Sequence, residues 1–442
     1  MKKVLILAYD FPPYVSVGGL RPYNWFKYFH EFGVYPVVVT RQWDNKYGNE
    51  LDYISRSEAT WAIIDESAKG TIIRVPYEPN YSNRLLLKYG KNRYKFIRKL
   101  ITAYFEFLQF ILPIGTKREL YKAANNYLIG NKVDVIIATG DPFILFKYAS
   151  DLGRKFKIPW IGDYRDLWSQ EIYIQKKPLL RRWSSYFERK IVNTAATLTT
   201  VDDFFATKIS SIIPDVSCQI LSNGYDPEVV RSIENIPQQK NELRISFIGT
   251  IYDWHPIESF LTVFKEYITA NENANIKLHF YGVNSEEELN QLIDTKFFKI
   301  KEHVRLFPKM KNNVLLAKIA EDNVMLLFNY YSFMGTKIYD YLGVNRKILF
   351  CYENDNEANE LKRKYYKLDD NGSKNSHVQA DLVRKTKSGI VVKDARHLYG
   401  VFQDLCTEFS NNQYIACEST GIEKYSRKIK VKELAGIVKQ LY

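Results

Sequence analysis

Residues 2–29, KKVLILAYDFPPYVSVGGLRPYNWFKYF, join a short apolar run to a loop and then to an amphipathic segment rich in aromatic residues. The apolar run is bounded by turn residues, which predicts a buried strand, and the spacing of the apolar residues over 22–32 predicts a helix. Gly18 and Gly19 lie between the two elements. A strand, a loop and a helix in this order form the first unit of a parallel α/β sheet.

The same alternation continues along the chain in two blocks. Short runs rich in β-branched residues alternate with amphipathic segments, which predicts mostly parallel sheets covered by helices on both faces. A polar stretch at 227–243 contains two prolines and has no clear period, and the alternation restarts after it. We expect strands at 3–8, 35–40, 71–75, 133–139, 158–163 and 196–201 in the first block, and at 243–249, 276–282, 304–308, 323–329, 347–352 and 388–392 in the second.

The length and the two blocks together predict two domains. A chain of 442 residues is too long for one ordinary core. We therefore predict an α/β protein with two facing Rossmann-like domains, one over 1–226 and one over 244–420, with 227–243 as the linker. The amphipathic pattern within 421–442 predicts a closing helix.

The net charge and the cysteines indicate what kind of partner the protein binds and in which redox compartment it works. The formal net charge is +13, which indicates an anionic partner such as nucleic acid, anionic lipid or a phosphorylated ligand. The four cysteines lie far apart without a CxxC pair, which argues against a zinc site or a disulfide framework and fits a reducing cytoplasm. The first ten residues imitate a signal peptide, but their apolar run is short and ends at Asp10 without a cleavage site, so we expect a strand there.

One segment, 84–123, departs from the alternation. Its apolar centre, at about 101–114, contains Glu106 and Gln109, is too short to span a bilayer and is flanked by lysines and arginines. This combination predicts a helix lying in a membrane interface, with aromatic residues in the lipid and cations on lipid phosphates. The alternative is a long helical excursion packed on its own domain.

The loop after the first strand is a candidate binding site, because ligands bind at the carboxyl ends of the strands in a doubly wound sheet. Gly18 and Gly19 let the backbone approach a ligand, and N–H groups at a helix start favour anions. Arg21 supplies a fork of donors for a phosphate or a carboxylate. The spacing is not GxGxxG, so a dinucleotide fingerprint is absent, and a plain turn explains the glycines equally well.

The stretch IPWIGDYRDLW (158–168) places Asp163, Arg165 and Asp166 at the end of a predicted strand. Charged residues in such a position are costly to bury unless they pair. Either an Asp–Arg pair holds the end of the strand, or one carboxylate reaches the crevice at the edge of the sheet.

In the second block, FNYYSFMGTKIYDYLGVNRKILF (328–350) leads from a strand through Ser332 and Gly335 into a helix. Free N–H groups at 334–337 would face a diphosphate, and Thr336 and Lys337 would add a hydroxyl and a charge. Asp340, one turn into the helix, would accept hydrogen bonds from two ribose hydroxyls. The alternative is an ordinary helix start followed by an exposed acid.

The stretch ISFIGTIYDWHPIESF (245–260) repeats the arrangement, because a strand runs into Gly249 and Thr250 and then, after a short loop, His255. An imidazole at this edge of the sheet is able to donate a hydrogen bond to a phosphate. The alternative is a structural histidine.

Five stretches, in order, resemble the GT-B glycosyltransferases, and specifically the retaining family-4-like enzymes of bacterial surface-polysaccharide synthesis. They are FPPYVSVGGLRP, IPWIGDYRDLW, LSNGYD, FIGTIY and GTKIYDYLG. The resemblance covers nearly the whole chain. It implies two Rossmann-like domains across a cleft, with the acceptor on the N-terminal domain and the nucleotide-sugar mainly on the C-terminal domain. It also implies that the helix within 421–442 crosses back to the N-terminal domain.

The donor signature of this family is a pair of glutamates separated by seven residues, with a glycine turn between them. Ser332 stands in the place of the first glutamate, Asp340 in the place of the second, and Gly335 at the turn. The resemblance implies that Asp340 holds the ribose and that the amides around Gly335 and Thr336 hold the diphosphate. The serine leaves the identity of the donor sugar open.

The family also carries an arginine and a lysine after the first strand of the second domain, where this chain has Thr250 and His255. The leaving diphosphate therefore needs other cations. Arg21, Lys309 and Lys337 are the candidates.

The resemblance implies transfer, with retention, from a nucleotide-sugar to a lipid-linked or oligosaccharide acceptor in capsule, O-antigen or exopolysaccharide synthesis. The chain has no DxD motif, and we expect neither a cofactor nor a required metal ion. The catalytic group would be Asp163, Arg165 and Asp166, with Asp163 or Asp166 orienting the acceptor hydroxyl. The segment 84–123 would dock the enzyme on an anionic membrane surface, the inner face of the cytoplasmic membrane.

Three alternatives stay open at this point. A GT-B-fold sugar-nucleotide epimerase would need no lipid-seeking segment. A degenerate glycosyltransferase partner would account for Ser332, Thr250 and His255. A nucleic-acid-binding protein would place its cations on one face with stacking aromatics, whereas here the cations are densest beside an apolar run, so we expect no nucleic acid partner.

Overall fold

The computed structural model describes residues 1–14, 16–43, 51–170, 178–366 and 376–441. Two compact units divide the chain. Unit 1 comprises Met1–Ser222 and Lys428–Tyr442, and unit 2 comprises Asn223–Arg427. The chain therefore passes from unit 1 to unit 2 and back again, and the residues of each unit build a sheet and a core of their own. Tyr442, at the end of the predicted closing helix, lies outside the described residues.

Unit 1 contains an eight-stranded sheet in the order β3-β4-β2-β1-β5-β6-β7-β8. All its pairings are parallel except that of β3 with β4, which is antiparallel. Outward from β1, the parallel strands follow the order of a doubly wound Rossmann sheet. The strands are β1 (Lys2–Leu7), β2 (Val34–Arg41), β3 (Ile63–Ser67), β4 (Gly70–Val75), β5 (Val135–Gly140), β6 (Trp160–Tyr164), β7 (Thr197–Thr200) and β8 (Cys218–Ile220).

Helices cover both faces of this sheet, which is why its central strands are continuous apolar runs. One face packs against α1, whose Trp25 and Tyr28 are buried with Val4 and Ile6 of β1. The other face packs against α4 and α5. The helices of unit 1 are α1 (Val17–Tyr28), α2 (Tyr81–Tyr89), α3 (Lys95–Leu108), α4 (Arg118–Gly130), α5 (Ile144–Phe156), α6 (Pro178–Val192), α7 (Asp203–Ser210) and, apart from its first residue, α16 (Arg427–Gln440).

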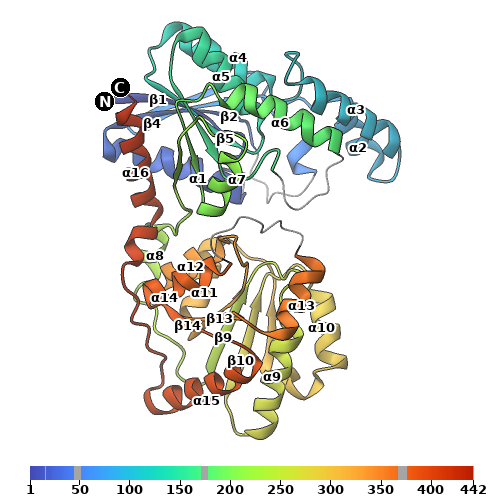
Figure 1. The fold of residues 1–442 in the computed structure, drawn as a ribbon, viewed down its shortest axis with the longest axis vertical. Coiled ribbons are helices and arrows are strands. Elements are labelled where there is room, and N and C mark those ends of the chain that lie inside the picture. Colours follow the sequence, from blue (N-terminus) through green and yellow to red (C-terminus); the bar gives the residue numbers. More distant parts are fainter. Residues whose placement is uncertain (15, 44–50, 171–177, 367–375, 442) are drawn as a thin grey trace. The chain divides into compact units, whose positions relative to one another are not determined.

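Helix α16 completes the core of unit 1 from the far end of the chain. Its Val431, Leu434 and Val438 are buried in the same cluster as the β1 side chains, and Figure 1 shows the helix beside β1. Lys428 also pairs with Glu31, 2.6 Å away. The return of the C-terminal helix to the first domain, which the family resemblance implies, is therefore confirmed.

Unit 2 contains a six-stranded, wholly parallel sheet in the order β11-β10-β9-β12-β13-β14. Numbered along the chain, this order is 3-2-1-4-5-6, that of a Rossmann fold, and its switch point lies between β9 and β12. The strands are β9 (Leu243–Ile248), β10 (Ile276–Tyr281), β11 (Val304–Phe307), β12 (Val324–Phe328), β13 (Lys347–Cys351) and β14 (Gly389–Val391).

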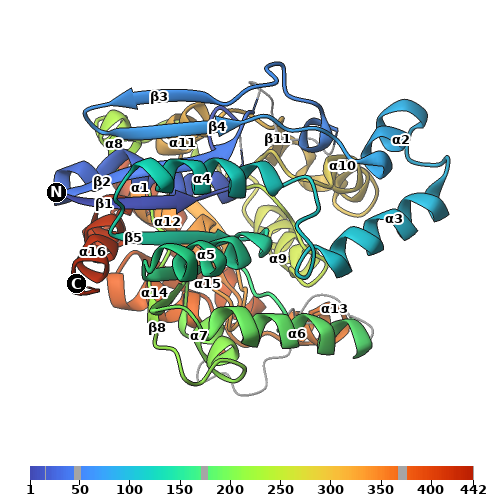
Figure 2. The same cartoon turned by 90° about the horizontal axis from the view of Figure 1, so that it is seen from above.

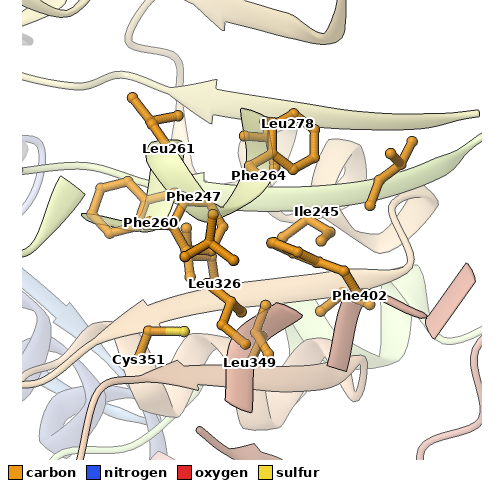
Figure 3. Close-up of a cluster of buried hydrophobic side chains, with 14 of the residues drawn as sticks. Ile245, Phe247, Phe260, Leu261, Phe264, Leu278, Leu326, Leu349, Cys351 and Phe402 are labelled. Atoms are coloured by element: carbon orange, nitrogen blue, oxygen red, sulfur yellow. The ribbon is translucent and has the colours of Figure 1, made fainter. Parts of the chain in front are cut away.

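The core of unit 2 has two halves, one on each face of the sheet. Figure 3 shows part of the first, in which Phe260 and Phe264 of α9 pack with Phe402 of α15 over the strand residues Phe247 and Leu326. The second half lies under α11, α12 and α14. The helices of unit 2 are α8 (Pro227–Ile233), α9 (Ile257–Ala270), α10 (Glu286–Thr295), α11 (Asn312–Glu321), α12 (Lys337–Val344), α13 (Asn356–Tyr365), α14 (Val378–Thr386) and α15 (Ala395–Asn412).

The structure adds elements to the sequence-based picture. Strands β3 and β8 are absent from the prediction, and the predicted linker at 227–243 contains α8. The first crossing between the units falls at Ser222–Asn223, a few residues before the expected end of the first domain. The fold class itself, two Rossmann-like α/β units, is as the sequence predicts.

The segment 84–123 forms the end of α2, all of α3 and the start of α4. Figure 2 shows α2 and α3 standing out from the sheet of unit 1, and α3 has no buried residue. Its Phe96, Leu100 and Tyr104 are 72%, 57% and 52% exposed, and they share one face of the helix because they are four residues apart. No helix within the described residues is both long and apolar enough to cross a membrane.

Candidate functional site

The loops that follow β9 and β12 meet at the switch point of unit 2. The two strands are neighbours, with Ile245 paired to Val324 and Ser246 to Met325. Gly249 and Thr250 follow β9 directly, and 332–337 follow β12. The structure therefore brings together two stretches that the sequence identifies separately, at the edge where open α/β sheets bind ligands.

Lys337 joins the two loops. Its ammonium group donates a hydrogen bond to the carbonyl oxygen of Thr250, 2.7 Å away, and lies 4.1 Å from the centre of the Phe247 ring. Gly249 has φ +70°, and a Cβ there would lie 3.4 Å from Cε of Lys337. Burial lowers the pKa of Lys337 to about 7, because a cation without a carboxylate partner is poorly stabilised away from water.

His255 lies beneath the same loops and is 2% exposed. Its Nδ1 accepts a hydrogen bond from the backbone N–H of Tyr252, 3.3 Å away. Burial, together with repulsion from Lys337, lowers the pKa of His255 well below its usual value. The ring is therefore neutral with its proton on Nε2, and within the described residues that buried nitrogen has no hydrogen-bond partner.

Helix α12 begins at this edge, a few residues after the carboxyl end of β12. Its N-cap residue, Thr336, makes no capping hydrogen bond through its side chain. The first N–H groups of a helix have no partner within the helix, and they carry a partial positive charge that favours anions. An uncapped helix start beside Lys337 is suited to a phosphate group.

Gln379 supports the loop before α12, and no pattern in the sequence indicates this role. It is fully buried, and its Oε1 accepts a hydrogen bond from the backbone N–H of Tyr330, 3.0 Å away. A Cβ at Gly335 would come within 3.3 Å of Nε2 of Gln379 and 3.5 Å of the Tyr330 ring. Gly335 is therefore required by close packing on Gln379, which holds the turn in place. Ser332, in the same loop, is fully buried.

Asp340 lies one turn into α12 and is partly buried. Burial raises its pKa to about 6, and Asp226 raises it further whereas Arg427 opposes the shift. The carboxylate is thus ionised at neutral pH but incompletely solvated, which suits it to accept hydrogen bonds from hydroxyl groups. Lys309, by contrast, is exposed after β11, two strands from β9.

In unit 1, Asp163 and Arg21 form a buried ion pair. Nε of Arg21 donates to both carboxylate oxygens at 3.1 and 3.0 Å, and Nη2 donates to Oδ1 at 2.7 Å. The hydroxyls of Thr139 and Thr199 donate to the same carboxylate at 3.0 and 2.7 Å. Asp163 is 0% exposed, so its oxygens are occupied and closed to a substrate. This geometry favours the structural alternative, with Arg21 rather than Arg165 as the partner.

The two glycines face different neighbours. A Cβ at Gly18 would overlap the guanidinium of Arg165, and one at Gly19 would lie 3.3 Å from the backbone of Asp10. Arg165 donates to the carbonyl oxygens of Gly140 and Asp141, 3.1 and 2.6 Å away. The close approach at Gly18 is therefore to a side chain of the protein itself.

A cavity of about 550 Å³ lies within unit 1, and all its lining residues belong to that unit. Asp166, the third member of the predicted catalytic group, lines it and has a side chain that is 62% exposed. Asp141 lines it too, directly after β5. Asp141 is not among the predicted site residues, although it follows the carboxyl end of a predicted strand, where ligands bind in such sheets.

No protein-family model matches the chain, and no curated protein matches it in sequence. Solved structures do match. Sucrose-phosphate synthase from Thermosynechococcus elongatus is 12% identical with a TM-score of 0.60, over 100% of this chain and 99% of that one. The UDP-forming trehalose-phosphate synthase of Burkholderia vietnamiensis is 8% identical with a TM-score of 0.54, over 100% of both chains.

A third neighbour is a glycosyltransferase from Rickettsia africae, 11% identical with a TM-score of 0.53, over 100% of this chain and 98% of that one. At such low identity these similarities concern the fold. The chain has the two-unit α/β fold of these glycosyltransferases, and the GT-B fold predicted from the sequence is confirmed.

Proposed function

We propose that the protein is a glycosyltransferase that moves a sugar from a nucleotide-sugar donor, bound by unit 2, to a saccharide acceptor. The observation that carries the proposal is the meeting, at one edge of the unit 2 sheet, of the uncapped start of α12, Lys337 and Asp340. A neighbour of the same fold, from E. coli, is described as bound with UDP-2-fluoro glucose, with a TM-score of 0.54.

The arrangement suits the chemistry of glycosyl transfer. When the bond between the anomeric carbon and the diphosphate breaks, negative charge grows on the diphosphate. The N–H groups at the start of α12, the ammonium of Lys337 and the Nε2–H of His255 are donors fixed in place before the reaction. Preorganised donors of this kind contribute about 3–4 kcal/mol each to stabilising a transition state.

The acceptor side of the proposal is transfer with retention to a lipid-linked saccharide of bacterial surface-polysaccharide synthesis. It is supported by α3, whose exposed face carries Phe96, Leu100 and Tyr104. The same stretch of chain carries five exposed cations, namely Lys88, Lys91, Arg93, Lys95 and Lys99. A helix with exposed aromatic residues and flanking cations binds anionic lipid surfaces. The protein would then work as a peripheral enzyme on the membrane that carries its acceptor.

The test is a binding screen followed by product analysis. UDP-, GDP-, ADP- and dTDP-sugars are added to the full chain and the melting temperature is measured. We expect one nucleotide class to stabilise the protein, by about 2.7 kcal/mol at a concentration one hundred times its dissociation constant. The matching donor is then incubated with a polyprenyl-diphosphate-linked saccharide, and the lipid fraction is analysed by mass spectrometry.

A glycosylated lipid product supports the proposal. Conversion of the nucleotide-sugar without an acceptor would indicate an epimerase instead. Failure of every nucleotide-sugar to bind would contradict the proposal.

A further inference from the structure

The cavity of about 550 Å³ in unit 1 has a composition that selects its occupant. We propose that it binds an uncharged sugar residue of the acceptor and excludes sugar phosphates. The identification of the bound sugar as part of the acceptor rests on the proposed function. Binding of the sugar itself can be tested without any donor. The size falls within the range of roughly 300–1,000 Å³ typical of small-molecule sites.

Aromatic rings form the walls of the cavity and hold one another in place. Phe143 stacks on Trp168 with ring centres 5.1 Å apart and planes 4° apart, and Phe110 lies 5.1 Å from the same tryptophan. Phe107 of α3 contacts Trp183 of α6, with ring centres 5.7 Å apart. Flat, rigid aromatic surfaces suit the C–H faces of a pyranose ring, because they offer contact area at little entropic cost.

The charged residues that line the cavity are mainly acids. Glu106, Asp141 and Asp166 line it together with one cation, Lys117. Carboxylates only accept hydrogen bonds, and sugar hydroxyls donate them. A phosphate group carries about −1.5 to −2 charges at neutral pH and is repelled by neighbouring Asp and Glu. An uncharged sugar is therefore favoured over a sugar phosphate.

Trp183 adds a donor. Its Nε1 is buried and has no hydrogen-bond partner within the described residues, and a buried N–H without a partner is uncommon. A hydroxyl or ring oxygen of a sugar in the cavity would accept from it. A purely apolar occupant, such as an isoprenoid chain, would leave this N–H unpaired.

The location of the cavity fits an acceptor that is carried by a lipid. Glu106 and Phe107 of α3 line it, whereas Leu100 and Tyr104 of the same helix are exposed on the surface proposed to meet the membrane. On α6, Trp183 lines the cavity and Tyr186 is 57% exposed. One pair of helices thus contributes both the wall of the cavity and the lipid-facing surface.

The experiment measures binding to the full chain by saturation-transfer NMR and titration. The probes are methyl glycosides of glucose, galactose, mannose, N-acetylglucosamine and rhamnose, with the 6-phosphates of the three hexoses. We expect at least one methyl glycoside to bind, and each hexose 6-phosphate to bind about tenfold more weakly than its methyl glycoside, a discrimination of the size expected from like charges. Binding of no methyl glycoside, or tighter binding of the phosphates, overturns the proposal.

Two variants locate the site. Asp141→Asn with Asp166→Asn should reduce the discrimination against phosphates to about threefold or less, whereas Asp215→Asn, an exposed acid elsewhere in unit 1, should leave it unchanged. Trp183→Phe keeps an aromatic ring, although a smaller one, and removes the N–H, and should weaken glycoside binding by roughly 3- to 10-fold. Trp61→Phe, at a tryptophan that is 68% exposed, is its control. Glycoside binding that Trp183→Phe leaves intact, in a folded variant, overturns the assignment.

The donor screen separates this inference from the proposed function. Nucleotide-sugar binding without glycoside binding would overturn the cavity assignment and leave the proposed function standing. Glycoside binding with the expected discrimination, but without nucleotide-sugar binding, would support the cavity as a sugar site and contradict the proposed function.

Discussion

Lys337, the first residue of α12, donates a hydrogen bond to the carbonyl oxygen of Thr250, 2.7 Å away in the loop after β9. This contact ties together the two loops of the switch point in unit 2. Among the residues that the structure describes, this ammonium has no carboxylate partner, and burial lowers the pKa of Lys337 to about 7. The position is suited to an anion, and binding of an anion there should change the protonation of Lys337.

We predict that binding of the nucleotide-sugar takes up a proton at pH 8. Free Lys337 is mostly neutral at that pH because its pKa is about 7. A bound diphosphate favours the ammonium form and raises the pKa, so a proton enters with the ligand. Calorimetry in two buffers of different ionisation enthalpy measures the number of protons taken up. Lys337→Met should abolish the uptake, whereas Lys318→Met, at an exposed lysine of α11, should not. Binding without proton uptake by the wild-type protein would contradict this role.

Asp340→Asn should weaken donor binding and stabilise the free protein. The loss of hydrogen bonds to a charged group costs about 1.5–3 kcal/mol, which corresponds to a loss of roughly 10- to 100-fold in affinity. The folded pKa of about 6 lies above the unfolded value of 3.8. The folded state therefore binds more protons between these values, and its free energy of unfolding falls as the pH rises through that window.

Urea unfolding at pH 8 and pH 4 measures the change in the free energy of unfolding that Asp340→Asn causes. The variant should gain about 1–2 kcal/mol at pH 8, because Asp340 is partly exposed, and much less at pH 4. Glu360→Gln, at a glutamate of α13 that is 73% exposed, is the matched control. An unchanged donor affinity in Asp340→Asn would remove the ribose assignment.

Asp163→Asn should act on stability and leave donor binding unchanged. The substitution leaves the guanidinium of Arg21, which is only 10% exposed, without its charged partner. Breaking a buried ion pair from one side typically costs about 3–5 kcal/mol. Urea unfolding measures the loss, and nucleotide-sugar binding to unit 2 serves as the internal reference.

Asp166→Asn is the comparison for Asp163→Asn. Asp166 is 62% exposed, so its substitution should change stability by no more than about 0.5 kcal/mol. If it orients the acceptor, the turnover number should fall while donor affinity is unchanged. If Asp163→Asn and the wild type have equal free energies of unfolding, the ion pair between Asp163 and Arg21 contributes little to stability.

Gln379→Met should loosen the loop before α12. The methionine has a similar size but no acceptor for the N–H of Tyr330, and an unpaired buried N–H costs about 1–3 kcal/mol. We expect a lower melting temperature and weaker nucleotide-sugar binding, because the turn at Gly335 packs on this side chain. Gln291→Met, at an exposed glutamine of α10, is the control. Weaker stability without weaker binding would limit Gln379 to a structural role.

Replacing Phe96, Leu100 and Tyr104 by serine should abolish binding to anionic vesicles without unfolding the protein. These side chains are exposed on a helix with no buried residue, so surface substitutions there should change stability by no more than about 0.5 kcal/mol each. Vesicle sedimentation with phosphatidylglycerol at low and moderate salt is the measurement. Ile129→Ser with Phe298→Ser, at exposed apolar residues elsewhere, is the control.

A second variant tests the charges. Neutralising Lys95, Arg98, Lys99, Lys117 and Arg118 should weaken sedimentation, each cation contributing about 1 kcal/mol near the surface. Vesicle binding that survives both sets of substitutions would contradict the membrane proposal.

The fold was largely predictable because parallel strands buried on both faces are continuous apolar runs. β1 and β9 are examples, with four and five fully or almost fully buried residues in short apolar stretches. The missed strands lack that signal. β3 reads IIDES and is exposed throughout, as an edge strand can be, and β8 has only three residues. Neither shows a burial pattern in its sequence.

The local structure around the candidate residues was predictable where neighbours in the sequence define it, and not where distant partners do. The start of α12 follows from a strand, a glycine turn and a helix in one short stretch. The partner of Asp163 is Arg21, 142 residues away, and no local pattern indicates it. Arg165 over Gly18 and Gln379 under Gly335 are likewise long-range contacts. A pair of glycines indicates close approach without saying to what.

The return of α16 to unit 1 has a consequence for synthesis. Unit 2 is an insertion between two segments of unit 1, and Val431, Leu434 and Val438 of the second segment are buried in one cluster with the β1 side chains. During translation, the whole of unit 2 is synthesised before α16, so the apolar surface of the first sheet that α16 covers stays exposed until then. Until then the nascent chain exposes the apolar surface that α16 later covers, and this surface is available for chaperones to bind.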